Sequence, residues 1–101
     1  MRLSALQRFI LIQCLQSKNR TADKKACEKF YDRIPSHPSK HDITTIITRS
    51  VERLVEKELV IVYGWHTAQK WFIDRVRLTK QGSEVARRLL GVQQKFTFKN
   101  R

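Results

Sequence analysis

The sequence predicts a mainly α-helical domain with one small β-hairpin, in the order helix, helix, helix, strand, strand, helix. Apolar residues recur at spacings of three and four over 40–57, as in an amphipathic helix. Two β-branched and aromatic runs follow, at 59–63 and 70–79, with a short turn-like segment between them, which is typical of a hairpin. At 101 residues the chain is long enough for one domain with its own core.

Two helices are expected before residue 40. Ser4 and Gln7 match a capping box, which predicts a first helix over 5–16. Most of its circumference is apolar, so it requires burial on two sides. Either it is the central core helix, or its second side contacts a partner subunit. A polar, basic connector spans 18–25, and Thr21 or Asp23 caps a second helix that ends near Ile34.

The third helix, at 40–57, is the candidate reading helix. Two prolines place 34–39 in a loop, and Ser39 with Asp42 matches a second capping box. Arginine pairs bidentately with guanine and threonine contacts the thymine methyl group, so its polar face suits the major groove. The residues expected to read bases are Thr44, Thr45, Thr48 and Arg49. An ordinary solvated helix face is the alternative interpretation.

Phosphate contacts are expected from the start of this helix and from the hairpin. The helix dipole favours anions at the N-terminus. The hairpin tip is predicted at 64–69, with Phe72, Val76 and Leu78 on one face of the second strand and Trp71, Ile73, Arg75 and Arg77 on the other. The residues expected to contact phosphate or the minor groove are Lys40, His41, His66, Lys70, Arg75 and Arg77. For Trp65, stacking on a sugar or base and packing on its own sheet both remain open.

A fourth helix is predicted after Thr79, with a core stripe that includes Ala86 and Leu89 and an end at Gly91. The domain is therefore expected to span 1–91, with a basic tail or arm at 92–101. A short strand, a dimer arm and a disordered tail are all compatible with the alternation of Phe96 and Phe98. The tail and the broadly apolar first helix suggest a homodimer.

The charge predicts an anionic partner. The chain has 21 Lys and Arg against 9 Asp and Glu, for a net charge of +12, which would attract nucleic acid, an anionic membrane surface or an acidic protein. The segment 35–58 is neutral, with four basic and four acidic residues, so the excess lies on either side of it. That division suits phosphate binding by the flanks and base reading by the helix.

Several function classes have no support in the sequence. Cys14 and Cys27 form no CxxC pair and are not spaced from the histidines as zinc ligands are, so buried thiols are expected and no metal or cofactor. No residues suggest a catalytic triad, and we expect no enzyme. The apolar run at 9–12 is too short for a secretion signal or a membrane span. A reduced, intracellular compartment is the default.

Two motifs carry a family resemblance. ITRSVERLVEKELV at 47–60 and RLTKQGSEVARRLL at 77–90 resemble the recognition helix, the wing exit and the following helix of winged helix-turn-helix domains of the MarR/PadR-like transcription regulators. The resemblance implies sequence-specific binding of double-stranded DNA by a cytoplasmic, nucleoid-associated regulator, with 40–57 in the major groove and the wing, 59–79, on the backbone or minor groove. The alternative is a winged-helix module for protein interaction, architecture or RNA binding in a larger assembly.

The sequence departs from the family at two points. Glu58 stands where the family usually has glycine, so it must adopt a left-handed conformation or let the helix continue. The chain also lacks the long flanking helices that many members use to enclose an effector. The resemblance therefore implies no small-molecule effector here.

Overall fold

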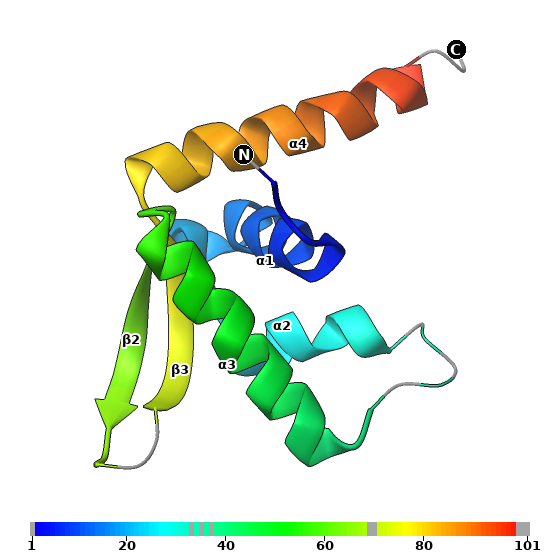
Figure 1. The fold of residues 1–101 in the computed structure, drawn as a ribbon. Helices are drawn as coiled ribbons and strands as arrows, with labels where there is room; N and C mark the ends of the chain where they lie inside the picture. The colour runs from blue at the N-terminus through cyan, green and yellow to red at the C-terminus, as the bar shows by residue number, and fades with distance from the viewer. Residues whose placement is uncertain (1, 33, 35, 37, 69–70, 99–101) are drawn as a thin grey trace.

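The computed structural model describes residues 2–32, 34, 36, 38–68 and 71–98, apart from the side chains of His66, Trp71 and 92–98. This part of the chain forms a mostly helical α+β domain with a three-stranded antiparallel sheet in the order β1-β3-β2 (Figure 1). The elements are α1 (Ala5–Gln16), the 3-10 turn η1 (Lys18–Arg20), β1 (Thr21–Asp23), α2 (Lys24–Glu28), the 3-10 turn η2 (Lys29–Tyr31), α3 (Lys40–Glu56), β2 (Val60–His66), β3 (Trp71–Leu78) and α4 (Lys80–Phe98).

α1 is the central core helix. Its bounds are those predicted, and the capping box is present: Ser4 Oγ accepts from the Gln7 N–H at 3.1 Å, while Gln7 Oε1 accepts from the Ser4 N–H at 2.9 Å. The helix packs against α4, α3, β1 and β3. Ile10, Leu11 and Cys14 are completely buried. The chain itself thus supplies partners for more than one side of this apolar helix.

β1 was not predicted. Thr21–Asp23 was expected within a polar connector, but it pairs with β3 in the register Thr21↔Arg77 to Asp23↔Arg75. The element order is therefore α-β-α-α-β-β-α rather than α-α-α-β-β-α. A three-residue strand has no periodicity of its own to detect, and it forms here because the edge of β3 offers unpaired backbone groups.

The second helix is shorter than expected. Asp23, the second of the two candidate caps, accepts from the Ala26 N–H at 2.8 Å. α2 ends at Glu28 and continues only as the 3-10 turn η2 to Tyr31, not as a helix to Ile34. Because β1 occupies 21–23, the helix starts after that strand and has little chain left before the proline-containing loop.

The hairpin has a different tip and different faces from those predicted. Gly64 to His66 belong to β2 rather than to the turn. The register shifts between Tyr63↔Arg75 and Gly64↔Ile73, which leaves one extra residue, Asp74, on β3. Such a bulge reverses the alternation beyond it. Ile73 is consequently buried with Val76 and Leu78, whereas Phe72 turns outward and is 36% exposed.

The exit from α3 uses the strained option at Glu58. α3 ends at Glu56 with Lys57 as its cap. Glu58 has φ 62°, so it adopts the left-handed conformation at the position where the winged helix-turn-helix family usually has glycine. The Leu59 N–H returns to the Leu54 carbonyl at 3.0 Å. This turn directs the chain out of α3 and into β2.

The same turn is joined to the start of α4. The Thr79 hydroxyl donates to the Glu58 carbonyl at 2.7 Å and accepts from the Gly82 N–H at 3.0 Å, which confirms Thr79 as a cap. A Cβ on Gly82 would lie 1.8 Å from the Leu59 carbonyl oxygen, so the two backbones approach too closely for any side chain. The base of the hairpin is thereby held between α3 and α4.

α4 does not end at Gly91. It runs to Phe98, so the predicted helix end is wrong and residues 92–98 are not a strand. A Cβ added at Gly91 would meet no atom within 4 Å, so no close approach requires glycine at this position. A glycine inside a helix costs only about 1 kcal/mol, which flanking helix-forming residues can offset. The side chains of Phe96 and Phe98 lie outside the described residues.

Candidate nucleic-acid interface

α3 presents a continuous polar ridge to solvent. Its opposite side is buried in the core through Ile43, Ile47, Val51 and Leu54. As predicted, Ser39 caps its first turn, accepting from the Asp42 N–H at 3.3 Å. Figure 1 shows α3 as one long helix that starts after the loop following α2 and ends at the base of the hairpin. The ridge opposite the core, at spacings of four, three and four, consists of Thr45, Arg49, Glu52 and Glu56.

The three threonines expected to read bases use their hydroxyl protons within the helix. Thr44 donates to the Lys40 carbonyl at 3.1 Å, Thr45 to the His41 carbonyl at 3.3 Å, and Thr48 to the Thr44 carbonyl at 2.9 Å. Each oxygen keeps accepting capacity, and each side chain keeps its methyl group. These residues are therefore suited to contact a thymine methyl or accept from a base amino group, rather than to donate.

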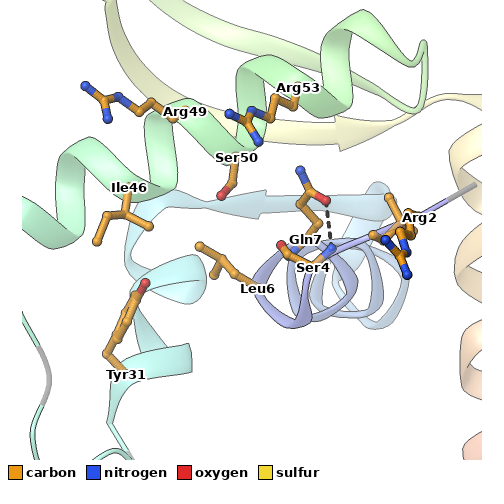
Figure 2. Close-up of a pocket in the computed structure, with 10 residues that line it drawn as sticks. Arg2, Ser4, Leu6, Gln7, Tyr31, Ile46, Arg49, Ser50 and Arg53 are labelled. Carbon is orange, nitrogen blue, oxygen red and sulfur yellow. Dashed lines mark hydrogen bonds between the residues drawn. The ribbon is translucent and has the colours of Figure 1, made fainter.

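Arg49 lies at the rim of a cleft between α3 and the N-terminus of α1. The cleft has a volume of about 650 Å³. Figure 2 shows Ser50 and Arg53 pointing from α3 toward the start of α1, while Arg49 extends outward along α3. We call this the basic cleft, defined by Arg2, Ser4, Gln7, Arg49, Ser50 and Arg53.

The basic cleft is lined by cationic side chains, which favour an anionic ligand. Three arginines line it, and no carboxylate occurs among its described lining residues. Guanidinium groups bind phosphate oxygens in a bidentate, charge-assisted geometry. The capping box at Ser4 places the positive end of the α1 dipole at the same edge. The cleft is open to solvent, so a phosphate of a longer backbone can enter it.

Sequence reasoning missed two of these arginines. Arg53 follows Arg49 by four residues, a spacing that places both on one side of the helix and was available as a signal. Arg2 precedes the first helix, and only the packing of α1 against α3 brings it to the cleft. Ser50 of α3 is half-buried and lines the same cleft.

The second half of α3 is electrostatically unfavourable for phosphates. Glu52 and Glu56 are both exposed on the outward ridge. Lys40 and His41, in contrast, are exposed at the N-terminal end, where the predicted phosphate contacts were placed. An anionic backbone can thus approach the first half of α3 but is repelled by the second.

The predicted hairpin residues do not share this surface. Because β3 turns Val76 and Leu78 into the core with the buried side of α3, Arg75 and Arg77 extend from the other face of the sheet. Arg75 lies over the Tyr63 ring at 5.5 Å from its centroid and forms an exposed ion pair with Asp74 at 3.3 Å. Lys70 and the His66 side chain lie outside the described residues. The structure therefore separates Arg75 and Arg77 from Lys40 and His41.

The two cysteines are buried thiols, as predicted. The Cys14 thiol donates to the Val76 carbonyl at 3.4 Å, and burial raises its pKa to about 11. Burial is also the main cause that raises the pKa of Cys27 to about 12, with smaller contributions from Cys14, Asp23 and Glu28. Both thiols therefore stay protonated at neutral pH and are poor nucleophiles.

The described residues offer neither a metal site nor a membrane-spanning helix. They contain no group of three or more His, Cys, Asp or Glu side chains placed to hold a metal ion. Within the same ranges, no helix has both the length and the apolar character that crossing a bilayer requires. Comparison of the chain with protein-family models and with curated proteins gives no match in either case. The geometry of α3, the basic cleft and the sheet is therefore the basis for assigning a function to this protein.

Proposed function

We propose that this protein is a winged helix-turn-helix domain that binds double-stranded DNA sequence-specifically and regulates transcription. The N-terminal half of α3 enters the major groove, and the hairpin β2–β3 acts as the wing on the backbone or minor groove. An antiparallel hairpin directly after α3, with β1 completing the sheet, is compatible with this fold. We further propose a homodimer in the cytoplasm, since a two-fold protein matches the half-site symmetry of many operators.

The basic cleft is the observation that carries the proposal. It adjoins the predicted reading residues of α3 and brings Arg2 of the N-terminal segment close to Arg49 and Arg53 of α3. A duplex whose major groove receives Thr45 and Thr48 would place phosphates of its backbone near the basic cleft and near the N-terminus of α3. Arg2 and Arg53 then bind the backbone on one side, and Lys40 and His41 bind it at the helix N-terminus. Phosphate contacts set the register, and the threonines with Arg49 discriminate bases.

Salt dependence tests the phosphate contacts. Fluorescence anisotropy with a labelled duplex should give an affinity that falls linearly with salt on a log–log plot, with a slope of about 0.9 per phosphate contacted. Arg53→Ala should reduce that slope by about 0.9 if the residue binds one phosphate. Arg88→Ala is the matched control, because it removes the same charge from an exposed site on α4. A flat salt dependence of the unmodified protein would overturn the proposal.

Base reading requires a separate test. Selection from random duplexes should yield a preferred sequence, and Arg49→Ala should relax the preference at one position by about 1–3 kcal/mol. Arg53→Ala should weaken binding to all duplexes nearly equally. If Arg49→Ala and Thr48→Ala leave every duplex bound as before, α3 does not read sequence, and an architectural or protein-interaction role replaces the proposed one.

A further inference from the structure

The face of the sheet that points away from the helices carries aromatic rings that the duplex proposal does not use, next to three arginines. We call it the outer sheet face, defined by Arg20, Tyr63, Trp65, Phe72, Arg75 and Arg77. The strand register pairs Tyr63 with Arg75 and Trp65 with Phe72. The bulge at Asp74 is what turns Phe72 to this side. Alternating residues of β2 and β3 therefore lie side by side on one exposed surface.

The aromatic part of this face is a platform open to solvent. The Trp65 and Phe72 rings are stacked, with centroids 5.2 Å apart and planes 12° from parallel. Trp65 is 60% exposed and Tyr63 is 38% exposed, so both side chains are accessible to solvent rather than buried in the core. Tyr63 and Trp65 are two residues apart on β2, a rise of about 7 Å. That spacing allows successive unstacked bases to rest on successive rings.

The basic part of the face is a groove beside the platform. Arg20, Arg75 and Arg77 line it together with Tyr63 and Thr21, and its volume is about 520 Å³. Arg20 reaches it through an unusual turn, since Asn19 and Arg20 have φ of 58° and 54°. Left-handed conformations cost non-glycine residues roughly 1–2 kcal/mol each. The structure bears that strain where η1 delivers an arginine to the edge of the groove.

We propose that the outer sheet face binds single-stranded DNA, with bases stacked on Trp65 and Tyr63 and phosphates held by Arg20 and Arg77. Aromatic platforms next to a basic groove are the arrangement that binds unpaired strands without sequence preference, because every base offers a stacking face. A duplex cannot use the platform, since its bases are already stacked on one another. The chemistry rests on this face alone, and only the choice of DNA over RNA rests on the proposed function.

Charge favours this occupant over a second copy of the chain. Two outer sheet faces packed together would bring six guanidinium groups of the same sign into one interface, whereas a nucleic-acid strand neutralises them. The exposed Asp74 carboxylate already pairs with Arg75, so Arg20 and Arg77 are the cations assigned to the strand. The net charge of +12 adds a long-range attraction in the same direction.

The test uses the intrinsic fluorescence of Trp65. The chain has two tryptophans, so Trp71→Phe leaves Trp65 as the only indole. Adding a 20-nucleotide oligo-dT should quench this fluorescence, and an abasic oligomer of the same length should neither quench it nor bind as tightly. In anisotropy, Trp65→Ala should weaken oligo-dT binding about 5- to 150-fold. Arg77→Ala should reduce the salt slope by about 0.7.

Two controls keep the result interpretable. Val55→Ala removes an exposed apolar side chain from α3 and should leave oligo-dT binding unchanged. Trp65→Phe preserves an aromatic ring and should restore most of the binding lost in Trp65→Ala, which excludes a general folding defect. Arg49→Ala should weaken duplex binding and leave oligo-dT binding unchanged. If the unmodified protein bound oligo-dT but no duplex, the proposed function would be overturned and this inference would stand.

Several outcomes would overturn the inference. Equal affinity for the abasic and the intact oligomer would show that bases do not stack here. Tighter binding of oligo-U than of oligo-dT would reject DNA as the occupant. Concentration-dependent blue shift of Trp65 without nucleic acid, with dimers in light scattering that Trp65→Ala abolishes, would assign the face to a second copy. Oligo-dT binding that survives Trp65→Ala would place the single-strand site elsewhere.

Discussion

The outward ridge of α3 and the outer sheet face differ in chemistry although they flank the same core. The ridge carries Thr45, whose hydroxyl proton is engaged within the helix, together with one arginine and two glutamates. The outer sheet face carries stacked aromatic rings and three arginines. The first is suited to discriminate between base edges but attracts anions poorly. The second attracts a phosphate backbone and stacks bases, but has few groups with which to distinguish one base from another.

The two surfaces of this small basic domain are thus suited to different kinds of contact with a nucleic acid. Segment 35–58 has no net charge, and Arg2 of the N-terminal segment adds a third cation to Arg49 and Arg53 in the basic cleft. The two surfaces are mechanically linked through the turn at Glu58, where Thr79 and Gly82 join the end of α3 to the start of α4. A substitution in the core that lies beneath both surfaces should weaken ligand binding at both of them. A substitution on one surface should weaken binding at that surface only.

The largest effect is expected from the core beneath α3. Leu54 is completely buried, and Leu54→Ala should lower the free energy of unfolding by about 2–5 kcal/mol through lost burial and a cavity. Urea denaturation measures this change. Duplex and oligo-dT binding should then be lost together as the folded fraction falls. Val55→Ala, at the exposed neighbouring position, should change stability by less than about 0.5 kcal/mol.

If Leu54→Ala abolished binding to one ligand while the protein remained folded, the two surfaces would not share a single cooperative unit. The comparison would then be between two separately stable parts of the molecule. Circular dichroism at the protein concentration used for binding distinguishes this result from simple unfolding.

Alkaline pH should weaken the core without altering the arginines of either surface. The folded pKa values of Cys14 and Cys27, about 11 and about 12, lie above the ordinary value of 9.0. The unfolded chain therefore releases these protons first, so stability is intact below pH 9 and declines as pH rises toward 11–12. Each thiol should cost about 1.4 kcal/mol per pH unit in that window. Urea denaturation at pH 8, 9 and 10 measures the decline.

The control for the alkaline prediction is a variant with both cysteines replaced by alanine. Its stability should depend less on pH over the same range, even if it is lower throughout. An identical pH dependence in the two proteins would assign the decline to other groups. At pH 8 the native thiols should also react with a thiol reagent far more slowly than those of the urea-unfolded chain.

The smallest effect is expected on the ridge itself. Glu52→Gln with Glu56→Gln removes two negative charges from the half of α3 that repels phosphates. At about 8 Å in water each charge contributes roughly 0.5 kcal/mol, so duplex affinity should rise about two- to threefold per substitution. Glu84→Gln, an exposed acid on α4, is the matched control. Oligo-dT affinity should change much less, and an equal gain for both ligands would mean that the two surfaces are not distinct.

Local signals in the sequence were sufficient to predict where three of the helices start. Ser4 with Gln7, Ser39 and Thr79 mark three helix starts correctly, because a cap requires only a side chain and the backbone a few residues away. The periodicity of α3 also predicts its buried side, including Ile43 and Leu54, since a helix repeats every 3.6 residues whatever its surroundings. The polar face of α3 could be predicted for the same reason.

Tertiary structure alone decided the features that join remote segments. β1 exists because β3 offers it an edge, and the bulge at Asp74 decides that Phe72 rather than Ile73 reaches the outer sheet face. α4 continues through Gly91, where an added Cβ would meet no atom within 4 Å and no close packing therefore marks a helix end. The basic cleft requires Arg2 of the N-terminal segment to meet Arg53 of α3. By itself, then, the sequence determined the capped, periodic helices and the net charge, whereas strand pairing, side-chain facing and the grouping of arginines depended on contacts between segments distant along the chain.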